Sequence, residues 1–242
     1  MRLVAAALVL LAAHAEAEDI GPLKTFGTGL SAFSHAAGPE TPIFNYTLSA
    51  TGKVGVMNHF WTTGDTDDAV FRYYIDGEAT ASIEFTAPAA AGAFFKDAGM
   101  WGNAQSGKGG AKGGWYVNYK IPFGKSITVT VEGSIGGGFV ILRGCENLPV
   151  QVGTVPLPIT ARMQLQKIES KVFQPLDWVP IVDLPTGEGL IYMTAIAANS
   201  TSNNFWEGCY HLYTPYSEAF PGTVLSTGME DFFDSGECAL SA

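Results

Sequence analysis

The segment Ser126–Val131 reads Ser-Ile-Thr-Val-Thr-Val, an uninterrupted alternation of polar and β-branched apolar residues. Successive side chains of a strand point to opposite faces, so this period of two predicts a strand with one face in a core and the other toward solvent. Thr, Val and Ile also suit a pleated surface because their Cβ atoms are branched. The segment therefore predicts a half-buried strand in a layered β fold.

Similar short segments recur through much of the chain. Val70–Ile75 and Ala81–Phe85 flank Asp76-Gly77, a dipeptide typical of hairpin turns. Several short strands at this spacing, joined by Gly- and Ala-rich connectors, predict a β-sandwich or jelly roll. The other expected strands are Asn45–Leu48, Lys53–Trp61, Trp115–Lys120, Phe139–Arg143 and Gly189–Met193.

We expect two domains, with the boundary at the end of a Pro-rich linker, Leu148–Pro158. Ala161–Phe173 has loosely spaced apolar residues and is soon followed by Pro175, which predicts a short helix. We therefore expect a first β domain over residues 18–158, and a helical connector with the start of a second β-rich domain over residues 159–242.

The first 17 residues have the features of a secretory signal peptide. Arg2 supplies the positive charge, Leu3–Ala13 is an apolar run, and Ala15-Glu16-Ala17 has the small-x-small form of a cleavage site. The apolar run is too short to span a membrane, and no later segment is long enough. The sequence predicts a secreted, extracellular protein without a membrane partner.

The composition indicates an ordered acidic protein. Hydrophobic residues make up 47% of the 242 residues and charged residues only 15%, which favours a folded core over disorder. The formal net charge of −10 disfavours nucleic acid and anionic membranes as partners. A neutral carbohydrate is a better match to this charge.

No metal or other cofactor is expected. Cys145, Cys209 and Cys238 allow one disulfide and one free thiol, but their spacing neither assigns the pair nor matches a zinc site. Gly102–Gly109 nearly spells a phosphate-binding loop, yet Gly109 replaces its hydroxyl residue, and neither the leading strand nor the following helix is expected. We expect a flexible surface loop there, which can border a binding cleft.

Two glutamates near the end of the chain are the candidate catalytic residues. Glu207 follows Phe205 and Trp206, whose apolar side chains would desolvate the carboxyl group and raise its pKa. Glu230 lies close to Gly228, where backbone and substrate can approach. Two carboxyl groups with separated pKa values are what glycoside hydrolysis requires. The alternative is that each Glu ends a strand on a solvated face.

These glutamates lie in motifs that resemble a known family. Trp-Glu-Gly-Cys (206–209) and Leu-Ser-Thr-Gly-Met-Glu-Asp-Phe-Phe (225–233) are similar to the paired signature of the DUF2961 family, glycoside hydrolases acting on α-D-fructofuranosyl and α-D-arabinofuranosyl linkages. Further segments similar to the first domain of that family are Phe71–Glu78, Ala81–Phe85, Ile121–Ile127 and the Asn-His-Phe-Trp of Asn58–Trp61.

The resemblance implies an all-β double jelly roll that assembles into homotrimers or multiples of them, with an active site near a subunit interface. The family continues well beyond its second glutamate, whereas this chain ends at Ala242. We therefore expect a complete first jelly roll and a truncated second one, so an inactive fragment is one alternative. Met229 also departs from the family, which usually has Thr there.

The resemblance further implies a retaining mechanism. Glu207 would be the general acid and then the general base, and Glu230 the nucleophile that forms a covalent furanosyl-enzyme. Retention requires the two carboxyl groups to lie roughly 5–5.5 Å apart, whereas a gap of roughly 6.5–9.5 Å would favour inversion.

Three further residues are candidates for substrate binding. Asp231 either binds sugar hydroxyls or accepts backbone N–H groups within its own turn. His59 and Trp61 would contact the sugar, because aromatic rings stack on the apolar faces of sugars; the alternative for Trp61 is a place in the core. A non-catalytic carbohydrate-binding jelly roll is the competing function.

Overall fold

The computed structural model describes residues 2–11, 20–36, 38–94, 99–110, 113–174, 177–183, 189–202, 205, 207, 208, 210–212, 224, 225 and 228. Within these residues the regular secondary structure is nearly all β-strand, arranged in several antiparallel sheets. The helix described there, α1 (Ala87–Ala90), is a single turn whose N-terminus is capped by the Thr86 side chain. The all-β fold predicted from the sequence is confirmed.

The chain forms two compact units. The larger comprises Val4–Glu169 and Trp178–Ala197, and the smaller comprises Met1–Leu3, Ser170–Asp177 and Ala198–Ala242. The larger unit contains a β-sandwich, which agrees with the jelly-roll-like first domain expected from the sequence. The second jelly roll stays a prediction.

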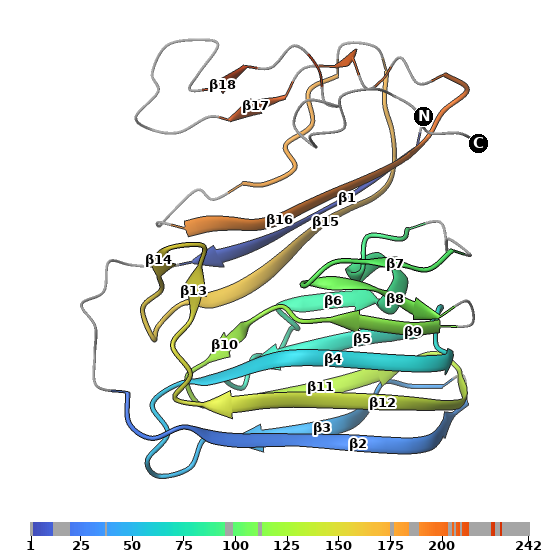
Figure 1. Ribbon diagram of the computed structural model, residues 1–242. Helices are drawn as coiled ribbons and strands as arrows, with labels where there is room; N and C mark the ends of the chain where they lie inside the picture. Colours follow the sequence, from blue (N-terminus) through green and yellow to red (C-terminus); the bar gives the residue numbers. More distant parts are fainter. Residues whose placement is uncertain are drawn as a thin grey trace. The chain divides into compact units, whose positions relative to one another are not determined.

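The sandwich consists of two sheets that lie face to face (Figure 1). The large sheet has the order β2-β12-β4-β9-β8-β7, with β10 also paired to β4, and the small sheet has the order β3-β11-β5-β6. The strands of the large sheet are β2 (Lys24–His35), β12 (Ile135–Glu146), β4 (Gly55–Asp65), β9 (Gly113–Val117), β8 (Ser106–Gly110), β7 (Trp101–Gly102) and β10 (Ile121–Phe123). Those of the small sheet are β3 (Thr41–Thr47), β11 (Ser126–Glu132), β5 (Val70–Ile75) and β6 (Ile83–Thr86).

The core lies between the two sheets and is built from alternate residues of their strands. Ile127, Val129 and Val131 of β11 are completely buried, as the alternating sequence of this segment predicts. Phe60 of β4 meets Phe71 of β5 edge to face, with ring centroids 4.8 Å apart. Aromatic and β-branched side chains from both sheets therefore form one continuous hydrophobic cluster.

The turn after β5 is hydrogen-bonded to a second turn of the sandwich, which contains Gly124. Asp76 and Gly77 both have positive φ, and Glu78 N–H donates to Ile75 C=O at 3.1 Å, which is the hairpin-type turn that Asp-Gly predicts. The Asp76 carboxylate also accepts the Gly124 N–H at 2.9 Å and the Arg162 guanidinium at 2.6 Å. Burial raises the pKa of Asp76, but these interactions outweigh it and hold the pKa below 3.8.

The helix predicted for Ala161–Phe173 is wrong, because these residues form strand β15 (Arg162–Val172). Its residues alternate near the start, with Met163 fully buried and Gln164 exposed. The Leu165 N–H donates to Ser82 C=O at 2.9 Å, and the Lys167 ammonium lies 2.7 Å from a Glu84 carboxylate oxygen. Tertiary pairing thus overrides a weak local helical pattern.

β15 belongs to a three-stranded sheet of order β15-β1-β16, in which β1 is Arg2–Leu11 and β16 is Gly189–Asn199. β1 coincides with the apolar run of the predicted signal peptide, whose cleavage site at Ala15–Ala17 lies outside the described residues. Secretion stays a prediction. Two short pairs complete the described strands: β13 (Gln151–Val152) with β14 (Val155–Pro156), and β17 (His211–Leu212) with β18 (Val224–Leu225).

A buried carboxylate fixes the end of β12. Glu146 has no exposed surface and accepts hydrogen bonds from the Tyr46 hydroxyl at 2.8 Å and the Ser49 N–H at 2.6 Å, with a further one from the Ser49 hydroxyl. Burial raises the pKa of Glu146, but these hydrogen bonds outweigh it, so the pKa lies below its ordinary value of 4.5. The charged form therefore holds β12 against the segment after β3.

Replacing Glu146 by Gln should lower the free energy of unfolding by about 2–3 kcal/mol near neutral pH, because an accepting oxygen is replaced by an NH₂ group that faces donors. Since the folded pKa is depressed, the wild-type advantage is present above pH 4.5 and is lost as the pH falls through the folded pKa. Urea unfolding at several pH values measures both effects. Glu169→Gln, on a side chain 62% exposed, is the control and should change stability by no more than about 0.5 kcal/mol. A Glu146→Gln loss that is equal at every pH would contradict this account.

Candidate functional site

A β-bulge in β4 determines which side chains of Asn-His-Phe-Trp face the core. On β12, Arg143 pairs with His59 and Gly144 pairs with Met57, so Asn58 is an extra residue without a partner there. The bulge shifts the alternation by one residue. Met57 and Phe60 consequently both point inward, with exposed fractions of 1% and 2%, whereas His59 and Trp61 turn to the outer face of the large sheet.

The neighbouring strands bring further side chains to this outer face. Trp61 lies directly opposite Tyr116 of β9 on one side and Ile141 of β12 on the other, while His59 lies opposite Arg143. Directly paired residues have Cβ atoms roughly 4.5–5.5 Å apart, so Trp61 and Tyr116 are neighbours on one surface. We call this surface the aromatic face and define it by His59, Trp61, Tyr116, Asn118, Ile141 and Arg143.

Glycines in β7 and β8 give Tyr116 its position. A Cβ atom at Gly102 would lie 2.1 Å from the Tyr116 hydroxyl oxygen, and one at Gly107 would lie 2.6 Å from it, so any side chain at either position would displace the tyrosine. The hydroxyl donates to the Asn103 C=O at 2.8 Å. Tyr116 is thus held across two glycines rather than free to rotate.

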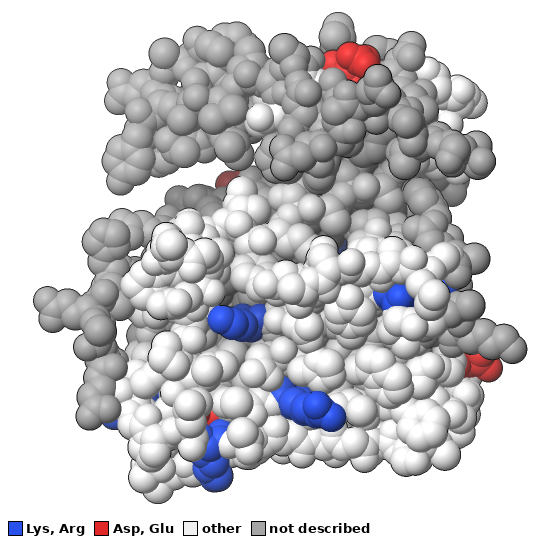
Figure 2. Space-filling model, in the orientation of Figure 1, with Lys and Arg blue, Asp and Glu red and all other residues white. Residues whose placement is uncertain are grey.

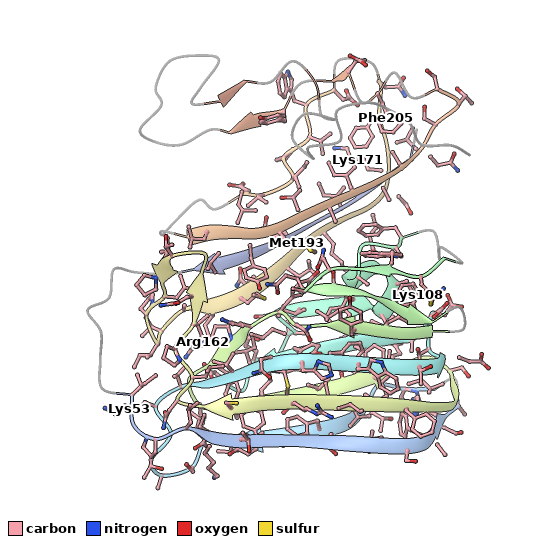
Figure 3. All side chains as sticks on the ribbon, in the orientation of Figure 1. Lys53, Lys108, Arg162, Lys171, Met193 and Phe205 are labelled. Carbon is pink, nitrogen blue, oxygen red and sulfur yellow. The ribbon has the colours of Figure 1, made fainter. Side chains whose placement is uncertain are left out.

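The flexible loop predicted for Gly102–Gly109 is therefore wrong for most of its length, since Ser106–Gly110 is strand β8 and pairs with β9. Lys108 is only 5% exposed, and its ammonium lies 4.9 Å above the Trp115 ring (Figure 3 labels Lys108). The glycines permit close backbone approach, so a segment with little side-chain volume still forms a strand.

His59 has a defined polar partner on the aromatic face. Its Nδ1 lies 2.7 Å from Asn118 Oδ1, and Asn118 Nδ2 donates to the Ala104 C=O at 2.9 Å. The pair lies one row along the sheet from Trp61 and Tyr116. The arrangement sets hydrogen-bonding groups beside two aromatic rings, which is the usual composition of a small-molecule site.

The aromatic face carries little negative charge although the chain has a net charge of −10. Figure 2 shows the front of the sandwich, over the large sheet, as mostly uncharged residues with isolated Lys and Arg. Carboxylates gather instead around Arg72 of β5, which pairs with Glu40 at 3.2 Å, Glu84 at 2.5 Å and Glu132 at 2.6 Å. Hydrogen bonding to Lys167 and to Arg72 holds the pKa of Glu84 below its ordinary 4.5.

The candidate catalytic residues belong to the smaller unit. Glu207 is exposed in a turn in which Gly208 N–H donates to Phe205 C=O at 3.2 Å. Glu230 and Asp231 lie outside the described residues, so the separation of the two carboxyl groups, and with it the retaining geometry, stays a prediction. Of the predicted site residues, the structure brings together His59 and Trp61.

Sequence reasoning missed four members of the aromatic face: Tyr116, Asn118, Ile141 and Arg143. The sequence predicts a strand over Trp115–Lys120, and the period of two places Tyr116 and Asn118 on the same side of it. Their position opposite Trp61 and His59 depends on the pairing of β9 with β4, which a single sequence does not specify.

No protein-family model matches the chain, and the comparison with curated proteins gives no match either. The family resemblance accordingly rests on the motifs quoted above. Within the described ranges, no three or more His, Cys, Asp or Glu side chains are grouped to hold a metal ion. In that part of the chain no helix has the length and apolar character needed to cross a membrane.

Phe60 points into the core and Trp61 points to the outer face, so replacing them should affect stability differently. Phe60→Ala should lower the free energy of unfolding by about 3–5 kcal/mol, because it empties a buried site between the sheets. Trp61→Ala should cost only about 1 kcal/mol, since its side chain lies on the outer face. Chemical unfolding of both variants measures the difference. If the two variants lose equal stability, or if Trp61→Ala loses more, the assignment of the bulge to Asn58 is wrong.

Proposed function

We propose that this protein binds carbohydrate on the aromatic face of its large sheet. The observation that carries the proposal is the pairing of Trp61 with Tyr116 on adjacent strands, beside the hydrogen-bonded His59 and Asn118. The C–H bonds on one side of a sugar ring carry slight positive charge and match the negative faces of aromatic rings. The polar pair then offers hydrogen bonds to the hydroxyl groups at the edge of the ring.

The charges favour a neutral ligand. The aromatic face includes one cation, Arg143, and three carboxylates of the same unit are engaged by Arg72 on the small sheet. Extended anions such as nucleic acids are bound through several cations, and one arginine on an acidic protein does not supply them. A furanose or another uncharged sugar suits this face.

Hydrolysis of α-furanosides is the second candidate function, and the paired motifs around Glu207 and Glu230 support it. In this proposal Glu207 protonates the leaving oxygen, Glu230 attacks the anomeric carbon, and Glu207 then activates water against the covalent furanosyl-enzyme. The exposure of Glu207 leaves its carboxyl group open to a substrate. Secretion, trimer assembly and a contact of Asp231 with substrate belong to the same proposal.

Trp61→Ala and Tyr116→Ala should each weaken binding to soluble arabinan or fructan at least tenfold, because each removes one stacking surface. Isothermal titration or affinity electrophoresis measures the change. Trp178→Ala is the matched control, since Trp178 belongs to the same unit and is 63% exposed. Equal binding by all three variants and the wild type would exclude the aromatic face as the binding site.

Glu207→Gln and Glu230→Gln should each lower the hydrolysis rate of an aryl α-D-arabinofuranoside or α-D-fructofuranoside by about 10²-fold or more, because each removes a group that reacts. Release of the aryl group measures the rate, and Glu169→Gln serves as the control for an exposed glutamate. If both variants stay within tenfold of the wild type, the hydrolase assignment is wrong, while the binding proposal stands on its own test.

A further inference from the structure

The orientation of the Asn118 amide is fixed by its surroundings. Nδ2 donates to the Ala104 C=O at 2.9 Å, and Oδ1 faces His59 Nδ1 at 2.7 Å. The reverse orientation would direct Oδ1 at the Ala104 carbonyl oxygen, which places two acceptors in contact without a hydrogen between them. The amide oxygen therefore points at the histidine.

This orientation determines which nitrogen of His59 carries the proton. Asn118 Oδ1 has no hydrogen, so His59 Nδ1 must donate. A neutral imidazole has a single N–H, which leaves the Nε2 lone pair as an acceptor. The strand pairing places the His59 ring on the outer face of the large sheet. In the described part of the chain, some buried polar atoms have no hydrogen-bond partner, and His59 Nε2 is not among them.

We propose that Asn118 is a positioning residue that holds His59 in the Nδ1–H tautomer, so that Nε2 accepts a hydrogen bond from a hydroxyl group of the ligand. The ligand part of this inference rests on the proposed carbohydrate function; the tautomer does not. The acceptor lies one row from Trp61 and Tyr116, so it selects a sugar with a free hydroxyl beside its stacked ring. An ether or carbonyl oxygen at that place would meet the lone pair without a proton to donate.

The turn between β7 and β8 is the template for this arrangement. Three successive carbonyl groups hold the face: Asn103 C=O accepts the Tyr116 hydroxyl, Ala104 C=O accepts Asn118 Nδ2, and Gln105 C=O accepts the Asn118 N–H at 2.7 Å. The turn is itself closed by the Asn103 side chain, which accepts the Gln105 N–H at 2.7 Å and the Ser106 N–H at 3.1 Å. One short turn thus fixes both the stacking tyrosine and the residue that orients His59.

A purely structural role for the His59–Asn118 pair is the competing explanation, in which the hydrogen bond only ties β4 to β9. Both explanations expect some loss of stability when Asn118 is changed. Both also expect the Nδ1–H tautomer in the wild type, because the same hydrogen bond is present in each. They differ in ligand binding, since a structural tie does not require Nε2 to accept a hydrogen bond from the ligand. The spectra therefore test the tautomer, and sugar binding by a folded Asn118 variant tests the role of Nε2.

Long-range ¹H–¹⁵N correlation on ¹⁵N-labelled protein, under conditions where the ring is neutral, reports the tautomer directly. The chain has four histidines, and His59→Gln identifies the signals of His59 by their loss. We expect the Nδ1–H pattern in the wild type and in Asn118→Asp, which keeps an accepting oxygen, and the Nε2–H pattern in Asn118→Leu. An Nε2–H ring in the wild type, or an unchanged tautomer in Asn118→Leu, would overturn the inference. The wild-type spectrum decides the point even if Asn118→Leu does not fold.

Titration with the same arabinan or fructan then tests the ligand part. Asn118→Leu should weaken binding at least tenfold, with thermal unfolding confirming that the variant is folded. Undiminished binding by folded Asn118→Leu would refute the role of Nε2. If the wild type binds none of these sugars, the carbohydrate proposal fails, and the tautomer is still decided by the spectra.

Discussion

The extra residue at Asn58 is the constraint on which the aromatic face depends. Without it, the strict alternation of β4 would put Met57, His59 and Trp61 on one side and Phe60 on the other. With it, Met57 and Phe60 share the core, while the polar histidine and the indole of Trp61 reach the outer face. A bulge in a central strand disrupts hydrogen bonds between the strands, which locally lowers stability. In return, it changes which side chains of β4 point outward.

The turn between β7 and β8, together with Gly102 and Gly107 of these strands, fixes the positions of the outward side chains on this face. Side chains on an exposed sheet face usually sample several rotamers, and a binding surface must restrict them before the ligand arrives. Here Tyr116 lies across Gly102 and Gly107 with its hydroxyl bound to Asn103, while Asn118 is held by two hydrogen bonds. The absence of side chains at the two glycines is therefore what permits a rigid tyrosine.

The sequence predicts local structure correctly where a short run of residues determines the backbone geometry by itself. The alternation in Ser126–Val131 and the Asp76-Gly77 turn specify local geometry, and both occur as predicted. The sequence was misleading for Ala161–Phe173, because β15 is stabilised by partners far along the chain, such as Ser82 and Glu84. His59 and Trp61 were identified as a pair, but the bulge that exposes them and the strand that supplies Tyr116 and Asn118 are tertiary features.

The residues proposed for sugar binding and those proposed for hydrolysis belong to different units of the chain. The aromatic face belongs to the larger unit, whose two sheets enclose a hydrophobic core of their own, so its geometry is maintained by that core. Glu207 belongs to the smaller unit and lies in an exposed turn. Stacking and hydrogen bonding on the aromatic face would contribute equally to the ground state and the transition state, which lowers KM without raising kcat. Rate enhancement has to come from the carboxyl groups, so sugar binding by the sandwich is compatible with either an enzyme or a binding protein.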